Sequence, residues 1–117
     1  MSVDKWLNKR YDPINYNCAH FACEVFKDET GFDLSTCLHG FYGGKGTKDT
    51  SIKKIVRLHR PVSPCITLLI PNGSKEPHIG VYLRGRVLHL SKDVGVLYQR
   101  LELVKIGFAT VRFYKCF

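Results

Sequence analysis

The sequence predicts an α+β protein, in which helices of the N-terminal half pack on one side of an antiparallel sheet of four to five strands. Three observations support this fold class. Apolar residues recur at helical spacing only before residue 60. After residue 64, short runs rich in β-branched and aromatic residues are separated by polar or glycine-containing turns. The 117 residues, 44% hydrophobic and 24% charged, are expected to form a single domain over residues 1–117.

The clearest helix is predicted from about residue 18 to about residue 29. Asn15 or Asn17 can cap its first turn, and Gly31 can end it. A turn is expected just before it, at residues 11–15. An apolar stripe at helical spacing runs along the helix, made of Phe21, Ala22, Val25 and Phe26.

Three shorter helices are also predicted in the N-terminal half. Residues 4–10 can form one, with Trp6 and Leu7 on its buried side. Asp33 or Ser35 can open another that continues to residue 38, and residues 49–58 carry apolar side chains along one face.

Five strands are predicted, at residues 65–70, 78–83, 86–91, 94–101 and 104–114. The first is a continuous apolar run, which is typical of a central strand. A two-residue turn at Arg84 and Gly85 would join the second and third strands in a hairpin that pairs Gly80 with His89. His78 and His89 then share a face as diagonal neighbours, with backbones about 7–8 Å apart, which long side chains can bridge.

Cys18 falls in the first turn of the predicted long helix. Unpaired backbone amides and the positive end of the helix dipole stabilise negative charge there, and the thiolate is the nucleophilic form of cysteine. The alternative is that Cys18 is a small core residue, because free cysteine is among the most often buried residue types.

His78 and His89 could supply what a cysteine hydrolase needs besides the thiol. One imidazole takes the thiol proton and later protonates the leaving amine, while a second polar group holds that imidazole in the right tautomer. Gly80 between them would leave room for a substrate or a helix terminus to approach the sheet. The alternative is a pair of partly buried histidines that bond only to backbone carbonyls.

The net charge of +8 favours an anionic partner, such as nucleic acid, cell-wall polymer or a membrane surface. The basic residues are dispersed and no nucleic-acid-binding signature is present, so specific nucleic-acid binding is not expected. A glycine-rich segment at residues 40–46 lacks the spacing of a phosphate-binding loop and is interpreted as a connection. The sequence shows no signal peptide and no apolar run of membrane-spanning length, so we expect synthesis in the cytoplasm, reduced cysteines and no membrane span.

Three segments together resemble the NlpC/P60 family of cysteine peptidases: Tyr16-Asn17-Cys18-Ala19-His20-Phe21, Pro77-His78-Ile79-Gly80-Val81-Tyr82-Leu83 and Arg86-Val87-Leu88-His89. The resemblance covers roughly residues 11–115 and is to the small single-domain members encoded by phages and prophages. The cysteine helix precedes the histidine strands, which is the family's unpermuted order. Two positions depart from the family pattern, because Asn17 stands where Asp is common and His20 stands where a small or polar residue is usual.

The resemblance implies a minimal papain-like fold and a triad without metal or cofactor. In it, Cys18 would be the nucleophile, His78 the general base and His89 the residue that orients the base. Family members typically cleave amide bonds in peptidoglycan stem peptides. The implied partners are therefore a peptidoglycan peptide and phage tail proteins, with the protein carried in a virion or delivered to the cell wall.

The resemblance also places an oxyanion and substrate site beside the nucleophile. The family has a tyrosine upstream of the cysteine at this site, and Tyr11 and Tyr16 are the candidates here. Asn17 would lie next to the site, and the backbone amide of Cys18 would be a second donor to the oxyanion.

Three other functions remain open. Cys18, His20 and Cys23 could bind zinc with a downstream histidine, although their spacing does not share one helix face well. A non-catalytic module on the same fold could bind a peptide or a phage protein. The order Asn-Cys-x-His-Phe also resembles permuted relatives that act as lipid acyltransferases, thioesterases or deubiquitinase-like proteases, although in those the base histidine precedes the cysteine.

Overall fold

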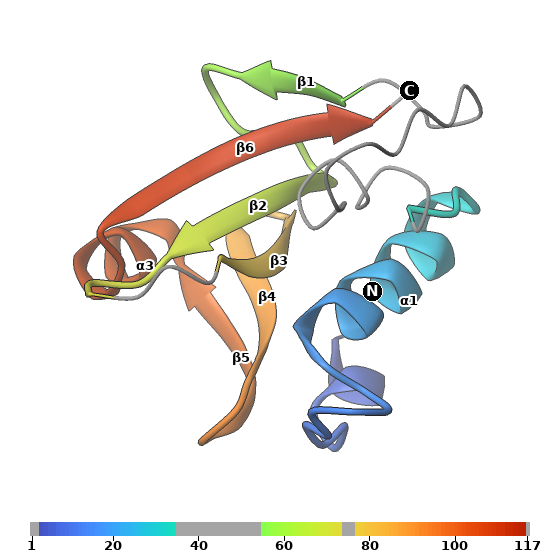
Figure 1. Ribbon diagram of the computed structural model, residues 1–117. Coiled ribbons are helices and arrows are strands. Elements are labelled where there is room, and N and C mark those ends of the chain that lie inside the picture. Colours follow the sequence, from blue (N-terminus) through green and yellow to red (C-terminus); the bar gives the residue numbers. More distant parts are fainter. Residues whose placement is uncertain (1–2, 35–54, 74–76, 117) are drawn as a thin grey trace, which may run out of the picture.

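The computed structural model describes residues 3–34, 55–73 and 77–116, and it has the expected α+β architecture (Figure 1). The N-terminal region holds a short 3-10 helix, η1 (Asp4–Trp6), and helix α1 (Cys18–Thr30), while helix α3 (Leu101–Gly107) lies between the last two strands. The strands are β1 (Ile55–Leu58), β2 (Cys65–Ile70), β3 (His78–Leu83), β4 (Arg86–Ser91), β5 (Gly95–Arg100) and β6 (Thr110–Cys116).

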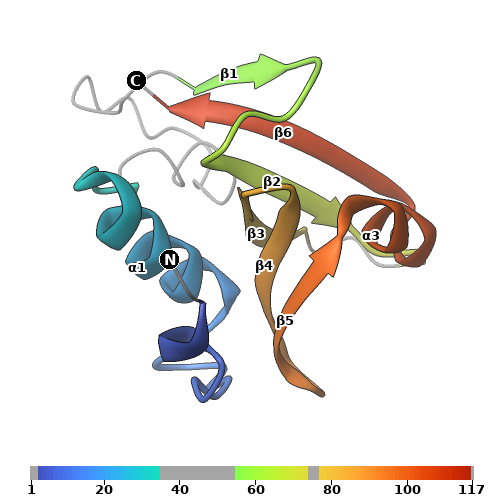
Figure 2. The same ribbon diagram turned by 180° about the vertical axis from the view of Figure 1, so that it is seen from behind.

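The six strands form one antiparallel sheet in the order β1-β6-β2-β3-β4-β5. Strands β2 to β5 are a meander, and β2 is a buried inner strand, as the sequence predicts. Strand β6 returns to pair with β2, and β1 pairs in turn with β6 (Figure 2). The prediction of four to five strands is therefore too low, because it did not include β1.

The single strand predicted at residues 104–114 is wrong. Leu101–Gly107 forms α3, and only Thr110–Cys116 is strand. Val104 is buried against Leu69 and Val87, with Leu101 and Phe108 packed beside it. These contacting positions are three and four residues apart, which is helical spacing. The expectation that helices occur only before residue 60 fails for the same reason.

The N-terminal predictions hold for the long helix and fail in part elsewhere. Helix α1 ends at Gly31, which adopts a φ of 78°. Residues 4–10 form only the short η1, in which Trp6 is buried, and Leu7, which follows it, is 48% exposed. Residues 55–58 are strand β1 and not helix, because their backbone joins the ladder of β6. The rest of the helix predicted at 49–58, residues 35–38 of the helix from Asp33 or Ser35, and the glycine-rich segment at 40–46 lie outside the described residues.

Each face of the sheet is covered by a different helix. Side chains alternate between the two faces along β3 and β4. Ile79, Val81 and Leu88 point to one face and pack there with the buried side chains of α1. Val87 points to the other face, where α3 packs. The prediction that helices occupy one side is therefore wrong for α3. No helix among the described residues has the length and apolar character needed to cross a bilayer.

Candidate active site

Helix α1 begins at Cys18 because Asn17 caps it. The Asn17 side-chain oxygen accepts hydrogen bonds from the backbone amides of Ala19 (3.0 Å) and His20 (3.1 Å). His20 completes a capping box, since its Nδ1 accepts a hydrogen bond from the amide of Asn17 at 3.1 Å. The cap is thus Asn17 and not Asn15, and it fixes Cys18 as the first helical residue.

The β3–β4 hairpin has the register that the sequence predicts. Arg84 and Gly85 adopt φ values of 50° and 86°, as a type I′ turn requires, and Gly80 pairs with His89. The two histidines meet across this hairpin, with Nε2 of His78 2.9 Å from Nδ1 of His89.

Gly80 makes room for this histidine contact. A Cβ at Gly80 would lie 3.0 Å from the Cβ of His89 and 3.0 Å from Cγ1 of Val87. The space over Gly80 is therefore filled by these two side chains, and the expectation that a substrate or a helix terminus would approach there is wrong.

Gln99 on β5 adds a fourth side chain that the sequence analysis did not identify. Its Oε1 lies 3.0 Å from Nε2 of His89. Leu97 pairs with His89 in the β4–β5 ladder, and Gln99 follows two residues later, so both point to the face of His89. Nothing in the sequence singles out Gln99, because its role depends on the pairing of β5 with β4.

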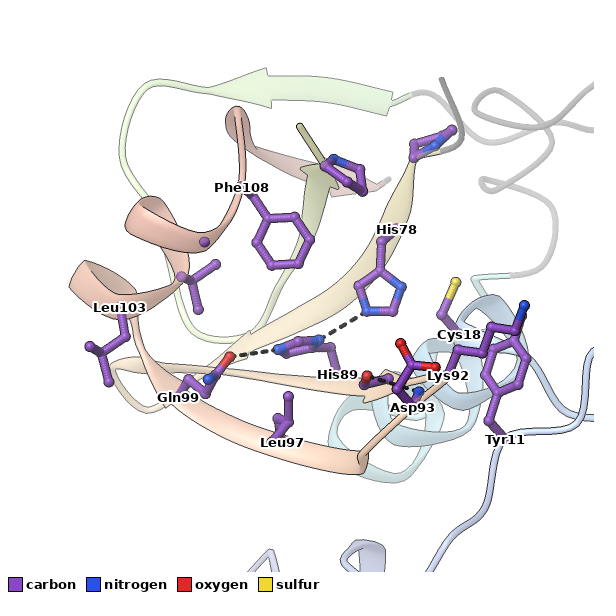
Figure 3. Close-up of a pocket in the computed structure, with 15 residues that line it drawn as sticks. Tyr11, Cys18, His78, His89, Lys92, Asp93, Leu97, Gln99, Leu103 and Phe108 are labelled. Carbon is purple, nitrogen blue, oxygen red and sulfur yellow. Dashed lines mark hydrogen bonds between the residues drawn. The ribbon is translucent and has the colours of Figure 1, made fainter. Parts of the chain in front are cut away.

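The three predicted catalytic residues line one cavity of about 490 Å³ (Figure 3). Cys18 reaches it from the start of α1, His78 from the first residue of β3 and His89 from the middle of β4. Nε2 of His78 faces His89, and Figure 3 shows the other ring nitrogen, Nδ1, on the side where the Cys18 sulfur lies. Gln99 lines the same cavity, together with the charged residues Lys92 and Asp93 and the apolar residues Leu97, Leu103, Val104 and Phe108.

Burial keeps the two histidines neutral near pH 7. It lowers the pKa of His78 from 6.5 to about 4, with a smaller contribution from the neighbouring His89. Burial also lowers the pKa of His89, which is 2% exposed, while its hydrogen bond to Gln99 acts in the opposite direction. The ring of Phe108 contributes to this enclosure, since it stacks parallel to His78 with centroids 6.1 Å apart.

No protein-family model matches the chain, and no curated protein matches its sequence at a significant level.

The three residues predicted for the oxyanion and substrate site lie in different surroundings. Tyr11 lines the cavity with Cys18, and both residues also line a second hollow. The Tyr16 hydroxyl donates a hydrogen bond to Glu24, and burial together with this carboxylate raises the pKa of Tyr16. Asn17 is among the residues that line the second hollow, and its side-chain oxygen is engaged in the helix cap. Tyr11 is thus the tyrosine that the fold brings to the cavity.

The residues considered as zinc ligands do not assemble into a metal site. Nδ1 of His20 is engaged in the cap of α1, and burial raises the pKa of the Cys23 thiol to about 11. Among the described residues, no group of three or more histidine, cysteine or acidic side chains could hold a metal ion.

Proposed function

We propose that the protein is a thiol hydrolase that cleaves an amide bond, with Cys18 as nucleophile, His78 as general base and His89 as the residue that orients His78. One observation carries this proposal. Cys18 at the start of α1 lines the same cavity as a pair of histidines whose ring nitrogens are 2.9 Å apart. A cysteine beside a base that a third group holds is the constellation of nucleophilic thiol catalysis.

In the proposed reaction, Nδ1 of His78 accepts the thiol proton as Sγ of Cys18 attacks the substrate carbonyl carbon. The tetrahedral intermediate collapses to a thioester when the amide C–N bond breaks, and the leaving amine takes the proton from His78. Water then attacks the thioester carbonyl and gives one proton to His78. The C–S bond breaks, the carboxylic acid leaves, and His78 returns its proton to the sulfur of Cys18. A neutral His78 is the form that this sequence requires at its start, and the burial of the ring favours it.

Tyr11 is the proposed side-chain donor to the oxyanion, together with the backbone amide of Cys18. Donors directed at the oxygen that becomes negative stabilise the intermediate more than the ground state. The position of Tyr11 beside Cys18 in both hollows supports this role, whereas the bond of Tyr16 to Glu24 occupies the other candidate.

The proposed substrate is a peptide of peptidoglycan stem type, in a phage or prophage context with tail proteins as partners. This choice rests on the sequence resemblance to the NlpC/P60 peptidases and the minimal papain-like fold that it implies. The net charge of +8 agrees with an anionic cell-wall substrate. Lys92 and Asp93 at the cavity offer ionic contacts to the charged groups of such peptides.

A second candidate is acyl transfer or thioester hydrolysis on a lipid-like substrate. The apolar wall of the cavity, formed by Leu97, Leu103, Val104 and Phe108, favours it. Both candidates share the Cys18 thioester and differ in the acyl group, in the leaving group and, for acyl transfer, in the acceptor. Acyl-thioester and muropeptide substrates therefore distinguish them.

The test is iodoacetamide alkylation of each cysteine at pH 6 to 8, read by mass spectrometry. Cys18 should react fastest and should slow in His78→Ala, because the base is lost. Cys23 and Cys65 are internal controls, since burial raises the pKa of each to about 11. Cys18→Ala should abolish muropeptide cleavage, and His78→Ala should lower its rate by about 10²–10⁴-fold.

Two results would overturn the mechanism. One is an alkylation rate of Cys18 no higher than that of Cys23 or Cys65, and the other is a Cys18→Ala protein that still cleaves substrate. The non-catalytic peptide-binding module would then be the better interpretation.

A further inference from the structure

The histidine pair continues to the side-chain oxygen of Gln99, an atom that can only accept a hydrogen bond. Oε1 of Gln99 lies 3.0 Å from Nε2 of His89, and an amide oxygen has no proton to donate. With the amide oxygen turned toward the ring, His89 donates this bond and carries its proton on Nε2. In a neutral ring this leaves Nδ1 of His89 as an acceptor.

The proton on His89 fixes the proton on His78 in turn. Its Nε2 lies 2.9 Å from the acceptor Nδ1 of His89, so it must donate and carry the proton. Nδ1 of His78 is then left with its lone pair. This is the nitrogen that lies on the side of the Cys18 sulfur (Figure 3).

We infer that Gln99 is the positioning residue that sets the tautomers of both histidines, so that the bare nitrogen of His78 faces Cys18. This inference rests on the proposed function, because a bare nitrogen at this place matters only if His78 accepts the Cys18 proton. Gln99 acts through His89 and touches neither the thiol nor the substrate carbonyl.

A neutral amide at this place also sets the charge of the pair. A carboxylate on Nε2 of His89 would stabilise a protonated ring, whereas Gln99 orients the ring without a negative charge. The other titratable groups that line the cavity are Cys18 and Tyr11, together with Lys92 and Asp93, whose charges have opposite signs. Gln99 thus orients the His89 ring and leaves the base, His78, neutral over most of the pH range.

The first experiment reads the tautomers directly and needs no activity. Nitrogen-15 NMR of the imidazole rings in the wild-type protein at pH 7 should show both His78 and His89 protonated at Nε2. A proton on Nδ1 of either ring would overturn the inference. This measurement keeps its meaning even if Cys18 proves unreactive, which would defeat the proposed function alone.

The second experiment uses two variants of similar size, Gln99→Glu and Gln99→Leu, with alkylation of Cys18 as readout. In Gln99→Glu, the acid limb of the pH profile should move upward by about 1–3 pH units, because the new carboxylate stabilises the protonated pair. In Gln99→Leu, the rate at pH 7 should fall about tenfold, because His89 loses its acceptor and the tautomers mix.

The matched control is Tyr98→Phe on the same strand. The Tyr98 hydroxyl donates to the carbonyl of Leu83 at 2.7 Å, and as the neighbour of Gln99 it points to the opposite face of β5. This variant should lose stability and keep the pH profile of the wild type. Gln99 variants that keep a wild-type profile while Cys18 stays reactive would show that Gln99 has no positioning role.

Discussion

Asn17 and His20 cap helix α1 reciprocally, each accepting a hydrogen bond from the backbone amide of the other at 3.1 Å. Glutamate or glutamine usually takes the second place in such a capping box, and here an imidazole does so. The two residues that depart from the NlpC/P60 pattern are thus partners in one local structure. They hold the backbone on which Cys18 sits.

Replacing the cap should destabilise the protein measurably. Asn17→Ala removes the acceptor for two amides and should lower the free energy of unfolding by about 1 kcal/mol. Asn15→Ala is the control, since the side-chain amide of Asn15 makes one long hydrogen bond, at 3.4 Å, to the Asp12 carboxylate. Urea unfolding of both variants checks this, and an equal loss in the two would contradict the cap assignment.

Gly80→Ala should strain the hairpin and disturb the histidine pair. The new Cβ would lie 3.0 Å from His89 and Val87 atoms and 3.1 Å from the Leu88 carbonyl oxygen. Overpacking of this kind costs about 1–3 kcal/mol, and Cys18 alkylation should slow as His89 shifts. Gly107→Ala is the matched control, because a Cβ there meets nothing within 4 Å. Urea unfolding and alkylation together test the prediction, which fails if both variants behave alike.

The buried histidines should make the protein less stable as the pH falls. The pKa of His78 is about 4 in the folded protein and 6.5 ordinarily, so the unfolded chain binds the proton more readily. Stability is then fully present above pH 6.5 and is lost progressively down to about pH 4, by on the order of 2–3 kcal/mol. Urea midpoints at pH 7, 6 and 5 should show this decline, and His78→Gln should flatten it. The exposed His59 offers a control in His59→Gln, and a decline equally steep in both variants would refute the assignment.

Substitution of the two candidate tyrosines should have different effects on kcat. Tyr11→Phe removes a proposed oxyanion donor and should lower kcat for muropeptide cleavage by about 10²–10³-fold with little change in KM. Tyr16→Phe removes the bond to Glu24 and should cost about 1 kcal/mol of stability with kcat nearly unchanged. A fall in kcat for Tyr16→Phe and not for Tyr11→Phe would contradict this prediction and make Tyr16 the oxyanion donor.

Local sequence signals account for much of the site. Asn17 and Gly31 delimit α1 because capping and the left-handed C-terminal position depend on the residues themselves. Arg84 and Gly85 set the β3–β4 register because a two-residue turn leaves little choice of pairing, and this register brings His78 to His89.

The errors arise where distant contacts decide the structure. Residues 55–58 suit a helix by their spacing, yet β6 offers them a backbone ladder. Residues 101–107 carry apolar side chains on several sides, so a strand and a helix fit them equally well until Val104 packs against Leu69 and Val87.

The sequence by itself thus determined where Cys18 stands on its helix and which face of the hairpin carries the two histidines. Only the tertiary structure decided that α1 and α3 cover opposite faces of the sheet and that Tyr11 reaches the cavity while Tyr16 turns to Glu24. It also decided that Gln99 completes the histidine chain. The physical reason is that caps and tight turns are set by neighbours in sequence, whereas helix docking and side-chain partners depend on residues brought together by the packed sheet.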